Sequence, residues 1–480
     1  MIGMSDSRKK IIIIGGGITG LSTAYFIQES LKAQALPVDC LLIEAEGRLG
    51  GKIQSEQVDG FIIEGGPDSF ITQKKWGVEL CRRLGLTERL VQTNPIDKSI
   101  FVLCRGKLVP FPEGFNLMVP SRLIPFMLTP LISPMGKARM GMDLFIPKKK
   151  TQADESIASF VRRRLGEEAV QQFAQPILAG IFAGDAEKLS MQATFPQFAA
   201  LEQKYGSLIR GMRQGRGKAK GPASSKAEWS LFVTLRDGLS SLPLSLRERL
   251  NGVEILSGKA VTAVAPVNRR YAVQVGSEQY LADAVVVTTH THRAAAWIAA
   301  WDNSLSNLLK DIPYVSTATV SVGYKKADVP HSLKGFGFVV PRKENCSIKA
   351  STWSSTKFQG RAPKDHVLIR TFLGGADRDA FIDRDDKDLV AGVRDDLRKI
   401  LGIEAEPVVA KVFRWIKANP QYLVGHLDRV ADIERQVQKH GGFFLAGAAY
   451  RGVGIPDCIE QGMRAAEKVM AWLSGGEDTG

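Results

Sequence analysis

The stretch Lys9-Lys10-Ile11-Ile12-Ile13-Ile14-Gly15-Gly16-Gly17-Ile18-Thr19-Gly20 decides the fold of this 480-residue chain. Its isoleucine run is short, continuous and closed by glycines, which is typical of a strand buried on both faces of a parallel sheet. A helical run follows. Gly15 permits the tight turn, Gly17 lets the backbone approach a pyrophosphate, and Gly20 lets the helix pack close on the strand. The pattern predicts a dinucleotide-binding unit, with a glycine-rich turn in another α/β domain as the alternative.

The next strand, Val38–Glu44, ends on an acid whose carboxylate can hold ribose hydroxyls. Arg48-Leu49-Gly50-Gly51-Lys52 follows it, with two glycines between basic residues. A flavin dinucleotide needs a second backbone segment beside its phosphates and ring, and the basic side chains add charge near the diphosphate. We therefore expect FAD rather than NAD, with a basic surface turn as the alternative. The residues expected to contact FAD here are Gly15, Gly16, Gly17, Ile18, Thr19, Gly20, Glu44, Arg48, Gly51 and Lys52.

Length and charge indicate the class of protein and its partners. A chain of 480 residues is too long for one compact core, so two or three domains are expected. Lysine and arginine number 64 against 50 acids, a net charge of +14 that favours anionic partners. No nucleic-acid-binding motif accompanies the charge, so nucleic acid is not expected as a partner.

Cysteine spacing and the beginning of the chain indicate a cytoplasmic protein. The five cysteines are far apart and do not cluster with the six histidines, so we expect neither a disulfide framework nor a metal site. The charged first residues run directly into the nucleotide strand, which argues against a signal peptide. The most apolar span, residues 117–135, is interrupted by Arg122 and four prolines, so it does not predict a transmembrane helix.

Several further segments carry specific expectations. Residues 58–64 predict one short strand, and the turn Gly65-Gly66-Pro67-Asp68-Ser69-Phe70 after it predicts either ligand contacts or a helix cap. Residues 101–109 predict a hairpin. The Met- and Phe-rich region after it, edged by lysines, suits either a membrane surface or the wall of an apolar pocket. Residues 210–226, rich in lysine, arginine, glycine and serine, predict a mobile basic loop.

The last part of the chain returns to the nucleotide unit. The Val-rich run at 284–289 predicts another doubly buried strand, and residues 317–324, 337–340 and 367–373 predict strands of a separate sheet. Near the end, Gly442-Phe443-Phe444-Leu445-Ala446-Gly447 predicts a strand, and a helix opens in the tract 451–462, where Pro456 suits the first turn. A helix N-terminus aimed at a flavin ring would stabilise the negative charge of the reduced ring.

Taken together, these motifs resemble the flavin amine oxidase superfamily, and within it the FAD-dependent porphyrinogen oxidases. The more specific motifs are Gly65-Gly66-Pro67-Asp68-Ser69-Phe70, Gly180-Ile181-Phe182-Ala183-Gly184-Asp185, Thr194-Phe195-Pro196 and Gly452-Val453-Gly454-Ile455-Pro456-Asp457-Cys458. The resemblance covers nearly the whole chain. It implies an α/β fold with a discontinuous Rossmann-like FAD-binding domain, a mixed-sheet substrate domain and an α-helical membrane-facing domain. The FAD-binding domain is expected to comprise residues 1–60, 231–295 and 413–480. The substrate domain would comprise residues 61–100, 191–230 (with the basic loop) and 296–412. The helical domain would comprise residues 101–190.

The resemblance also implies a set of site residues. FAD would be noncovalent, because no Ser-Gly-Gly-Cys attachment tract is present around Cys458. Lys74 is the candidate for holding a substrate carboxylate, with a solvated surface lysine as the alternative. Phe182 is the candidate aromatic of the substrate cavity, although it lacks the hydroxyl of a tyrosine, and ordinary core packing is the alternative. The further expected FAD contacts are Gly66, Pro67, Asp68, Ser69, Val261, Trp415, Gly447, Val453, Gly454 and Ile455.

The implied reaction is the six-electron oxidation of a porphyrinogen to a porphyrin in haem biosynthesis, with molecular oxygen reoxidising the flavin to give H2O2. Coproporphyrinogen III has four carboxylates and protoporphyrinogen IX has two, so the positive charge favours the former. The resemblance further implies a cytoplasmic enzyme with peripheral contact at the inner face of the cell membrane, and product hand-off to a ferrochelatase. A flavin amine oxidase, a carotenoid-type desaturase and a non-enzymatic relative that shuttles prenylated proteins share the motifs and stay open as alternatives.

Overall fold

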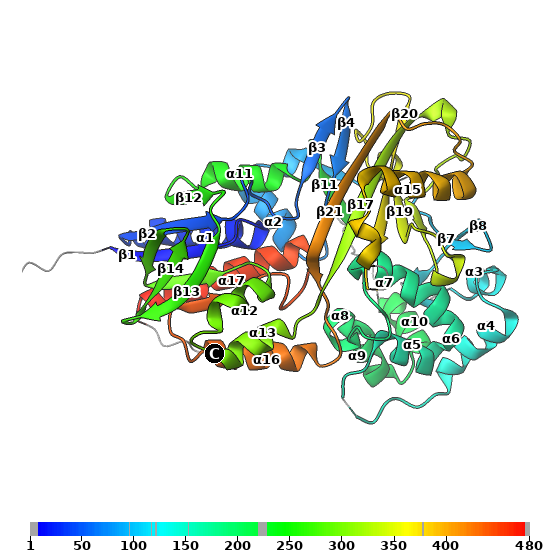
Figure 1. The fold of residues 1–480 in the computed structure, drawn as a ribbon. Helices are drawn as coiled ribbons and strands as arrows, with labels where there is room; N and C mark the ends of the chain where they lie inside the picture. The colour runs from blue at the N-terminus through cyan, green and yellow to red at the C-terminus, as the bar shows by residue number, and fades with distance from the viewer. Residues whose placement is uncertain are drawn as a thin grey trace, which may run out of the picture.

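The structure of the chain is a computed structural model, and it describes residues 8–95, 97–116, 118–120, 122–151, 153–218, 228–376 and 379–475. Figure 1 shows a parallel sheet flanked by helices at one end, a long-stranded sheet above the centre, and a group of helices at the other end. The predicted α/β class is therefore confirmed. The polypeptide passes between these regions several times, so each region is built from segments far apart in the sequence.

The predicted nucleotide unit forms a five-stranded parallel sheet in the order β12-β2-β1-β16-β22. The strands are β1 (Lys9–Ile14), β2 (Val38–Glu44), β12 (Val253–Ser257), β16 (Ala284–Val287) and β22 (Phe443–Leu445). The side chains of β1 alternate between two cores, because successive residues of a strand point to opposite faces. All five strands are parallel, so their carboxyl ends lie at one edge of the sheet, where ligands of such folds bind.

Two helices from opposite ends of the sequence pack together on one face of this sheet. They are α1 (Ile18–Gln34) and α17 (Ile455–Leu473), drawn side by side in Figure 1. At their crossing a Cβ atom added to Gly462 would lie 2.6 Å from the Thr19 carbonyl oxygen, so only glycine fits there. The Lys9 Nζ atom donates to the Leu473 carbonyl oxygen at 2.7 Å and covers the end of α17. The two ends of the sequence therefore build one nucleotide-type domain.

One expectation about the first hundred residues needs correction, and one about the residues that follow is confirmed. Residues 58–64 form a hairpin of β3 (Ser55–Val58) and β4 (Phe61–Glu64), not one strand, because Asp59 and Gly60 adopt positive φ values of 49° and 80° in the turn between them. The hairpin predicted at 101–109 is present as β7 (Ile100–Cys104) and β8 (Lys107–Pro110). It joins the long-stranded sheet, in which β7 pairs with β18 (Gly337–Val339).

The long-stranded sheet has seven strands in the order β21-β17-β20-β19-β18-β7-β8. Its remaining strands are β17 (Tyr314–Lys325), β18 (Gly337–Val339), β19 (Ala350–Trp353), β20 (His366–Gly374) and β21 (Val409–Pro420). One face packs its apolar side chains against α15 (Asp386–Leu401). The strand β21 runs past the boundary expected at residue 412 and carries the chain from this sheet back toward the parallel sheet (Figure 1).

Smaller sheets join these parts. β5 (Phe70–Ile71), β11 (Phe232–Leu235) and β6 (Leu90–Gln92) form one antiparallel sheet, with α2 (Trp76–Arg83) between β5 and β6 in the sequence. β13 (Val261–Val267), β14 (Arg270–Val275) and β15 (Glu278–Ala282) form another, which packs against the parallel sheet. The helices α11 (Ser241–Arg249), α12 (Thr291–Ile298), α13 (Asn303–Lys310) and α16 (His426–Val437) cover the nucleotide region.

The helical region contains most of the remaining helices. They are α3 (Leu123–Leu128), α4 (Pro134–Gly141), α5 (Ile157–Leu165), α6 (Glu167–Ala169), α7 (Gln175–Phe182), α8 (Met191–Thr194), α9 (Pro196–Tyr205) and α10 (Leu208–Lys218). The loop expected at 210–226 is wrong as far as residue 218, because Leu208 and Ile209 are buried and anchor a helix; residues 219–227 lie outside the described part. Among the described residues no helix is both long and apolar enough to cross a bilayer.

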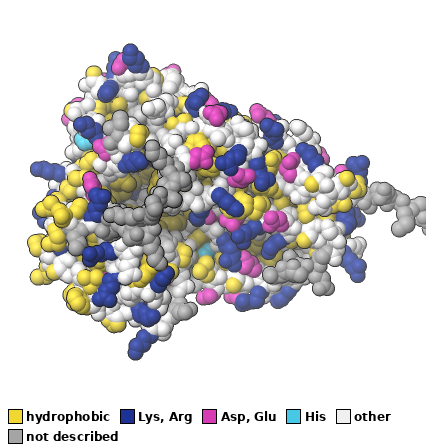
Figure 2. Space-filling view, turned by 180° about the vertical axis from the view of Figure 1, so that it is seen from behind, with side chains coloured by type: hydrophobic (Ala, Val, Ile, Leu, Met, Phe, Trp, Pro, Cys, Tyr) yellow, Lys and Arg dark blue, Asp and Glu magenta, His cyan; other side chains and the backbone are white. Residues whose placement is uncertain are grey.

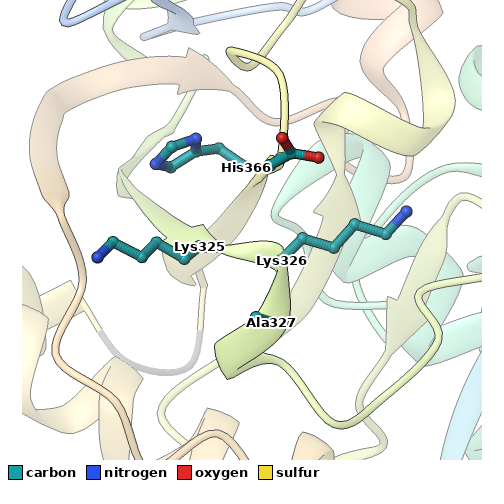
Figure 3. A pocket seen from close by; sticks show the side chains of 5 residues that line it. Lys325, Lys326, Ala327 and His366 are labelled. Carbon is teal, nitrogen blue, oxygen red and sulfur yellow. The ribbon is translucent and has the colours of Figure 1, made fainter.

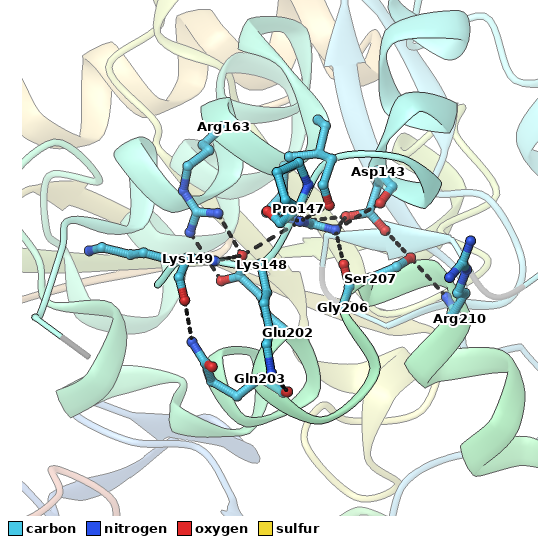
Figure 4. A network of polar contacts seen from close by, with 12 residues as sticks. Asp143, Pro147, Lys148, Lys149, Arg163, Glu202, Gln203, Gly206, Ser207 and Arg210 are labelled. Carbon is cyan, nitrogen blue, oxygen red and sulfur yellow. Dashed lines mark hydrogen bonds and ion pairs between the residues drawn. The ribbon is translucent and has the colours of Figure 1, made fainter. Parts of the chain in front are cut away.

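A buried charge network holds the helical region together (Figure 4). The Arg164 side chain has no solvent exposure, and its Nε atom donates to Asp143 Oδ1 at 2.6 Å. The other Asp143 oxygen accepts from the Ser207 hydroxyl at 2.5 Å, and Arg164 also donates to the Gly206 carbonyl oxygen at 2.9 Å. Burying two charges is tolerated only when they pair and their remaining donors and acceptors are satisfied, as they are here.

Candidate cofactor and substrate site

The glycine turn after β1 has the geometry that a phosphate group requires. The Gly15 amide donates to the Ile43 carbonyl oxygen at 2.8 Å, and a Cβ atom at Gly20 would lie 1.9 Å from the Gly15 carbonyl oxygen, so the helix sits tightly on the turn. A Cβ atom at Gly17, by contrast, would meet no atom within 4 Å. Gly17 is the N-cap of α1 and supplies no side chain to the first amides, here of Ile18 and Thr19. Open space before a helix N-terminus fits an anionic diphosphate.

Glu44 organises the same turn. Its Oε2 atom accepts from the Gly16 amide at 2.5 Å, and its Oε1 atom accepts from the Glu46 amide at 2.8 Å. The side chain is half-buried at the carboxyl end of β2, so its free lone pairs can still receive ribose hydroxyls. The predicted role of Glu44 is therefore compatible with a second, structural role that the sequence did not indicate.

The second glycine pair lies directly against the first turn. The Gly50 amide donates to the Gly16 carbonyl oxygen at 2.8 Å, and a Cβ atom at Gly51 would lie 3.2 Å from the Gly17 Cα atom. Of the two flanking basic residues, Arg48 faces Glu46 at 3.5 Å near the surface. Lys52 points elsewhere, because its Nζ atom donates to the Ala418 carbonyl oxygen at 2.9 Å. Burial lowers the pKa of Lys52, and its observed contact ties the turn to β21.

The Gly65-Gly66 segment is held between the nucleotide region and the seven-stranded sheet. The Gly65 carbonyl oxygen accepts from the Thr319 hydroxyl at 2.8 Å and from Trp415 Nε1 at 2.9 Å. The Gly66 carbonyl oxygen accepts from Arg370, which is almost fully buried. A Cβ atom at Gly66 would lie 1.8 Å from the Lys52 carbonyl oxygen, so the two predicted cofactor segments touch. Trp415 therefore contacts this segment directly, at the Gly65 carbonyl oxygen.

Asp68 is part of a buried ion pair in the turn that follows Pro67. The Lys357 Nζ atom lies 3.0 Å from Asp68 Oδ2, and the two side chains are 12% and 16% exposed. The Ser69 hydroxyl donates to Asp68 Oδ1 at 2.6 Å. Burial alone would raise the pKa of Asp68, but the charges of Lys357 and Arg370 hold it well below its usual range. The turn is thereby fixed to α14 (Ser354–Lys357), a contact between residues 289 positions apart.

The segment between β22 and α17, residues 446–454, is called here the β22–α17 loop. It leaves the carboxyl edge of the parallel sheet, and a Cβ atom at its Gly447 would lie 3.9 Å from Thr19 Oγ1. Gly454 is the N-cap of α17 and supplies no side chain to the first amides, so the amino end of the helix opens toward this loop. Val453 lies in the loop and Ile455 is buried at the start of the helix. The first and last glycine tracts are thus brought together, as the sequence predicts.

Two further candidates from the sequence, Phe182 and Val261, occupy different surroundings. Phe182 ends α7, contacts the Phe195 ring edge-on at 5.8 Å, and is half-buried. The same helix faces the seven-stranded sheet, since a Cβ atom at Gly180 would lie 3.6 Å from the Ala350 Cβ atom. Val261 begins β13 with its side chain buried in the core, beside residues 258 and 259, whose amides bond to the end of β2 and the loop after it.

A shallow hollow of about 470 Å³ at the other end of β17 is not part of this site (Figure 3). It is lined by Lys325, Lys326, Ala327, Asp365 and His366. β17 has 12 residues, so at roughly 3.3 Å per residue its two ends lie about 36 Å apart. The Tyr314 end is the one near the glycine turns, because the Tyr314 hydroxyl accepts from the Thr291 amide just after β16.

Sequence reasoning missed the residues that brace the site from outside the motifs. Lys357 and Arg370 hold the Gly66 to Ser69 turn, and Tyr422 and His426 contact the β22–α17 loop. His290, half-buried close to Lys52, was also missed; burial and the Lys52 charge lower its pKa to about 4. None of these residues stands in a recognisable local pattern. Only the position of His290 directly after the Val-rich strand could have indicated it, because ligands bind at strand carboxyl ends.

The chain is similar over nearly its whole length to proteins of one family. A family model described as flavin containing amine oxidoreductase matches residues 18–470. The chain is 39% identical to coproporphyrinogen III oxidase of Bacillus subtilis (98% of this chain, 100% of the relative) and 33% identical to chloroplastic protoporphyrinogen oxidase 1 of Spinacia oleracea (96% and 84%). A crystal structure from Exiguobacterium sp. 255-15, assigned as a protoporphyrinogen oxidase, superposes with a TM-score of 0.86 at 34% identity (98% and 100%). The chain therefore belongs to the flavin-containing amine oxidoreductases, and within them to the porphyrinogen oxidases.

Proposed function

We propose that the chain binds FAD noncovalently and oxidises coproporphyrinogen III to coproporphyrin III, consuming oxygen and releasing H2O2. The observation that carries the cofactor part is the open space at Gly17, framed by the Gly50-Gly51 pair, Glu44 and the β22–α17 loop. A bound flavin would supply hydride acceptance and reaction with oxygen. The chain's own residues would hold the diphosphate, orient the ring and exclude water.

Noncovalent attachment is supported by the state of Cys458. This residue lies in the first turn of α17 and is 5% exposed. Burial raises the pKa of its thiol to about 11, so at neutral pH it is protonated and a poor nucleophile. We therefore expect acid precipitation to release all of the flavin into the supernatant.

The substrate is proposed as a tetracarboxylate on the basis of charge. The net charge of +14 favours anionic ligands, and Lys74 places a half-exposed ammonium group beside the β22–α17 loop. Phe182 at the end of α7 would provide an aromatic wall for the macrocycle. The proposed substrate region lies beside the Gly65-Gly66 segment, between the seven-stranded sheet and α7.

A peripheral location at the inner face of the cell membrane is proposed for the helical region. Large apolar side chains are exposed along α3, α4 and the turn after them (Ile124, Met127, Leu128, Met135, Met142 and Phe145). Figure 2 shows hydrophobic side chains gathered with lysine and arginine at that end of the molecule. Such a surface can dock on anionic lipid without crossing it. There the porphyrin would be released for hand-off to a ferrochelatase.

A single set of assays tests the function. The purified protein should be yellow and should release FAD on denaturation. It should oxidise coproporphyrinogen III faster than protoporphyrinogen IX, with three H2O2 formed per porphyrin as a six-electron oxidation requires. Equal or reversed rates would overturn the substrate choice. A colourless protein that takes up no FAD, or turnover of amines or carotenoid precursors without porphyrinogen oxidation, would overturn the function itself.

A further inference from the structure

One segment, from residue 421 after β21 to residue 426 at the start of α16, contacts both the β22–α17 loop and the end of α7. Its Tyr422 side chain is 3% exposed, and the Tyr422 hydroxyl makes two hydrogen bonds to the loop. The hydroxyl donates to the Ala448 carbonyl oxygen at 2.6 Å and accepts from the Gly452 amide at 2.8 Å. One oxygen atom therefore fixes two loop positions four residues apart.

A histidine from the same segment supports the tyrosine ring. His426 has no solvent exposure, and its ring stacks on Tyr422 with 4.0 Å between centroids and 11° between planes. Its Nε2 atom lies 3.0 Å from the Tyr450 carbonyl oxygen, so Nε2 carries the proton and donates. Tyr422 and His426 together thus fix the backbone of the loop at three residues, Ala448, Tyr450 and Gly452.

The other side of the segment reaches the helical region. The Gln421 Nε2 atom donates to the Phe182 carbonyl oxygen at 3.0 Å, and the Ser190 amide donates to the Tyr422 carbonyl oxygen at 2.8 Å. Leu423 forms an isolated antiparallel bridge with Leu189. The residue expected at the substrate and the loop expected at the flavin ring are therefore attached to neighbouring residues of one short segment.

We propose that Tyr422 is a positioning residue that fixes the β22–α17 loop against the flavin ring, and that Gln421 fixes Phe182 relative to that loop. This inference rests on the proposed function. Hydride transfer depends steeply on the distance between donor and acceptor, so a displacement of about 1 Å can cost on the order of a hundredfold in rate. Residues 421–426 hold both the loop expected at the flavin and the helix end expected at the substrate. They would therefore set the distance between donor and acceptor without contacting either molecule.

The test uses the holoenzyme of three single variants. Tyr422→Phe removes the hydroxyl and keeps the stacked ring, so it should lower kcat about tenfold with KM within about twofold. It should also lower the midpoint potential of the bound flavin, because a looser helix N-terminus stabilises the reduced ring less. Tyr271→Phe is the matched control. Tyr271 is equally buried and donates to the Gly441 carbonyl oxygen at 3.2 Å, so its variant should match the wild type.

Gln421→Met tests the substrate side, because methionine keeps the length of glutamine and loses the donor. It should lower kcat/KM about tenfold and leave the flavin potential unchanged. If Tyr422→Phe does not fold, the kcat/KM of Gln421→Met still tests whether residues 421–426 position the site. Wild-type kcat and potential in a folded, flavin-loaded Tyr422→Phe enzyme would overturn the role of Tyr422, and wild-type kcat/KM in Gln421→Met would overturn that of Gln421. A wild type that holds flavin but oxidises no porphyrinogen overturns the proposed function alone, since the potential of Tyr422→Phe still tests this inference.

Discussion

The Lys74 ammonium group lies 2.5 Å from Asp457 Oδ1, although 383 residues separate the two in the sequence. Lys74 is half-exposed, with 51% of its side chain accessible, whereas Asp457 is only 13% exposed. The Asp457 carboxylate sits in the first turn of α17, where the helix dipole stabilises a negative charge. The pair holds an accessible cation at a defined place beside the β22–α17 loop.

We expect Lys74→Gln to raise KM for the tetracarboxylate substrate about tenfold with kcat nearly unchanged, because one charge-assisted contact is lost from the bound state. The difference from the wild type should shrink as salt is raised, since exposed charges are screened. Steady-state kinetics at low and high ionic strength check this. Lys75→Gln is the control, because the neighbouring Lys75 lies over the Trp76 ring. An identical change in both variants would contradict a specific role for Lys74.

The two glycines at the start of α1 should separate cofactor binding from folding. Gly17→Ala adds a methyl group into open space at a φ of −70°, so the apoprotein should keep its melting temperature and lose flavin. Gly20→Ala places the methyl group against the Gly15 carbonyl oxygen, so it should lower the melting temperature of the apoprotein as well. Thermal unfolding of flavin-free protein and a flavin titration measure the two effects. A Gly17→Ala protein with wild-type flavin affinity would contradict the placement of the diphosphate.

His426 should make stability depend on pH. Burial lowers its pKa from 6.5 to about 4, so between these values the unfolded chain binds a proton that the folded protein excludes. Stability then rises with pH through this window and is lost as pH falls, by about 2 kcal/mol between pH 7 and pH 5. Denaturant unfolding at both pH values gives the difference. His426→Phe keeps the stack and removes the titration, so its loss should be smaller by about that amount; an equal loss would refute the assignment.

Breaking the buried pair of Arg164 and Asp143 should destabilise the fold strongly. Arg164→Met leaves the Asp143 carboxylate buried without its partner, which costs about 3–5 kcal/mol. Arg162→Met is the matched control, because Arg162 pairs with Glu167 and Glu187 at the surface, where pairs contribute under about 1 kcal/mol. Denaturant unfolding compares the two variants. If Arg164→Met lowers the free energy of unfolding as little as Arg162→Met does, the network in Figure 4 contributes little to stability.

The parts of the fold that could be predicted are those set by local patterns. The isoleucine run of β1 and the glycines after it determine strand, turn and helix within twenty residues, and the glycines around β22 and α17 do the same. The hairpin of β3 and β4 was missed although Asp59-Gly60 is a typical turn pair, because the flanking residues also suit one continuous strand.

The residues that hold the segments of the site in place could not be predicted, for a physical reason. Lys357 meets Asp68, and Tyr422 meets Gly452, only because the chain folds back across two sheets. A buried lysine and a buried tyrosine have no local periodicity that distinguishes them from surface or core residues. Their roles depend on partners that become known only when the strands are placed. Pattern reasoning therefore finds segments that touch a ligand more easily than residues that hold those segments.

The bond from Lys9 to Leu473 spans 464 residues and has a consequence for biosynthesis. While a ribosome is still making the middle of the chain, α1 has no partner for the face that α17 will cover, and the parallel sheet lacks its edge strand β22. The proposed flavin site is therefore complete only after α17 has been translated, long after the glycine turn appears. Until then the nascent chain exposes an apolar helix, and a chaperone that shields such surfaces would raise the yield of active enzyme.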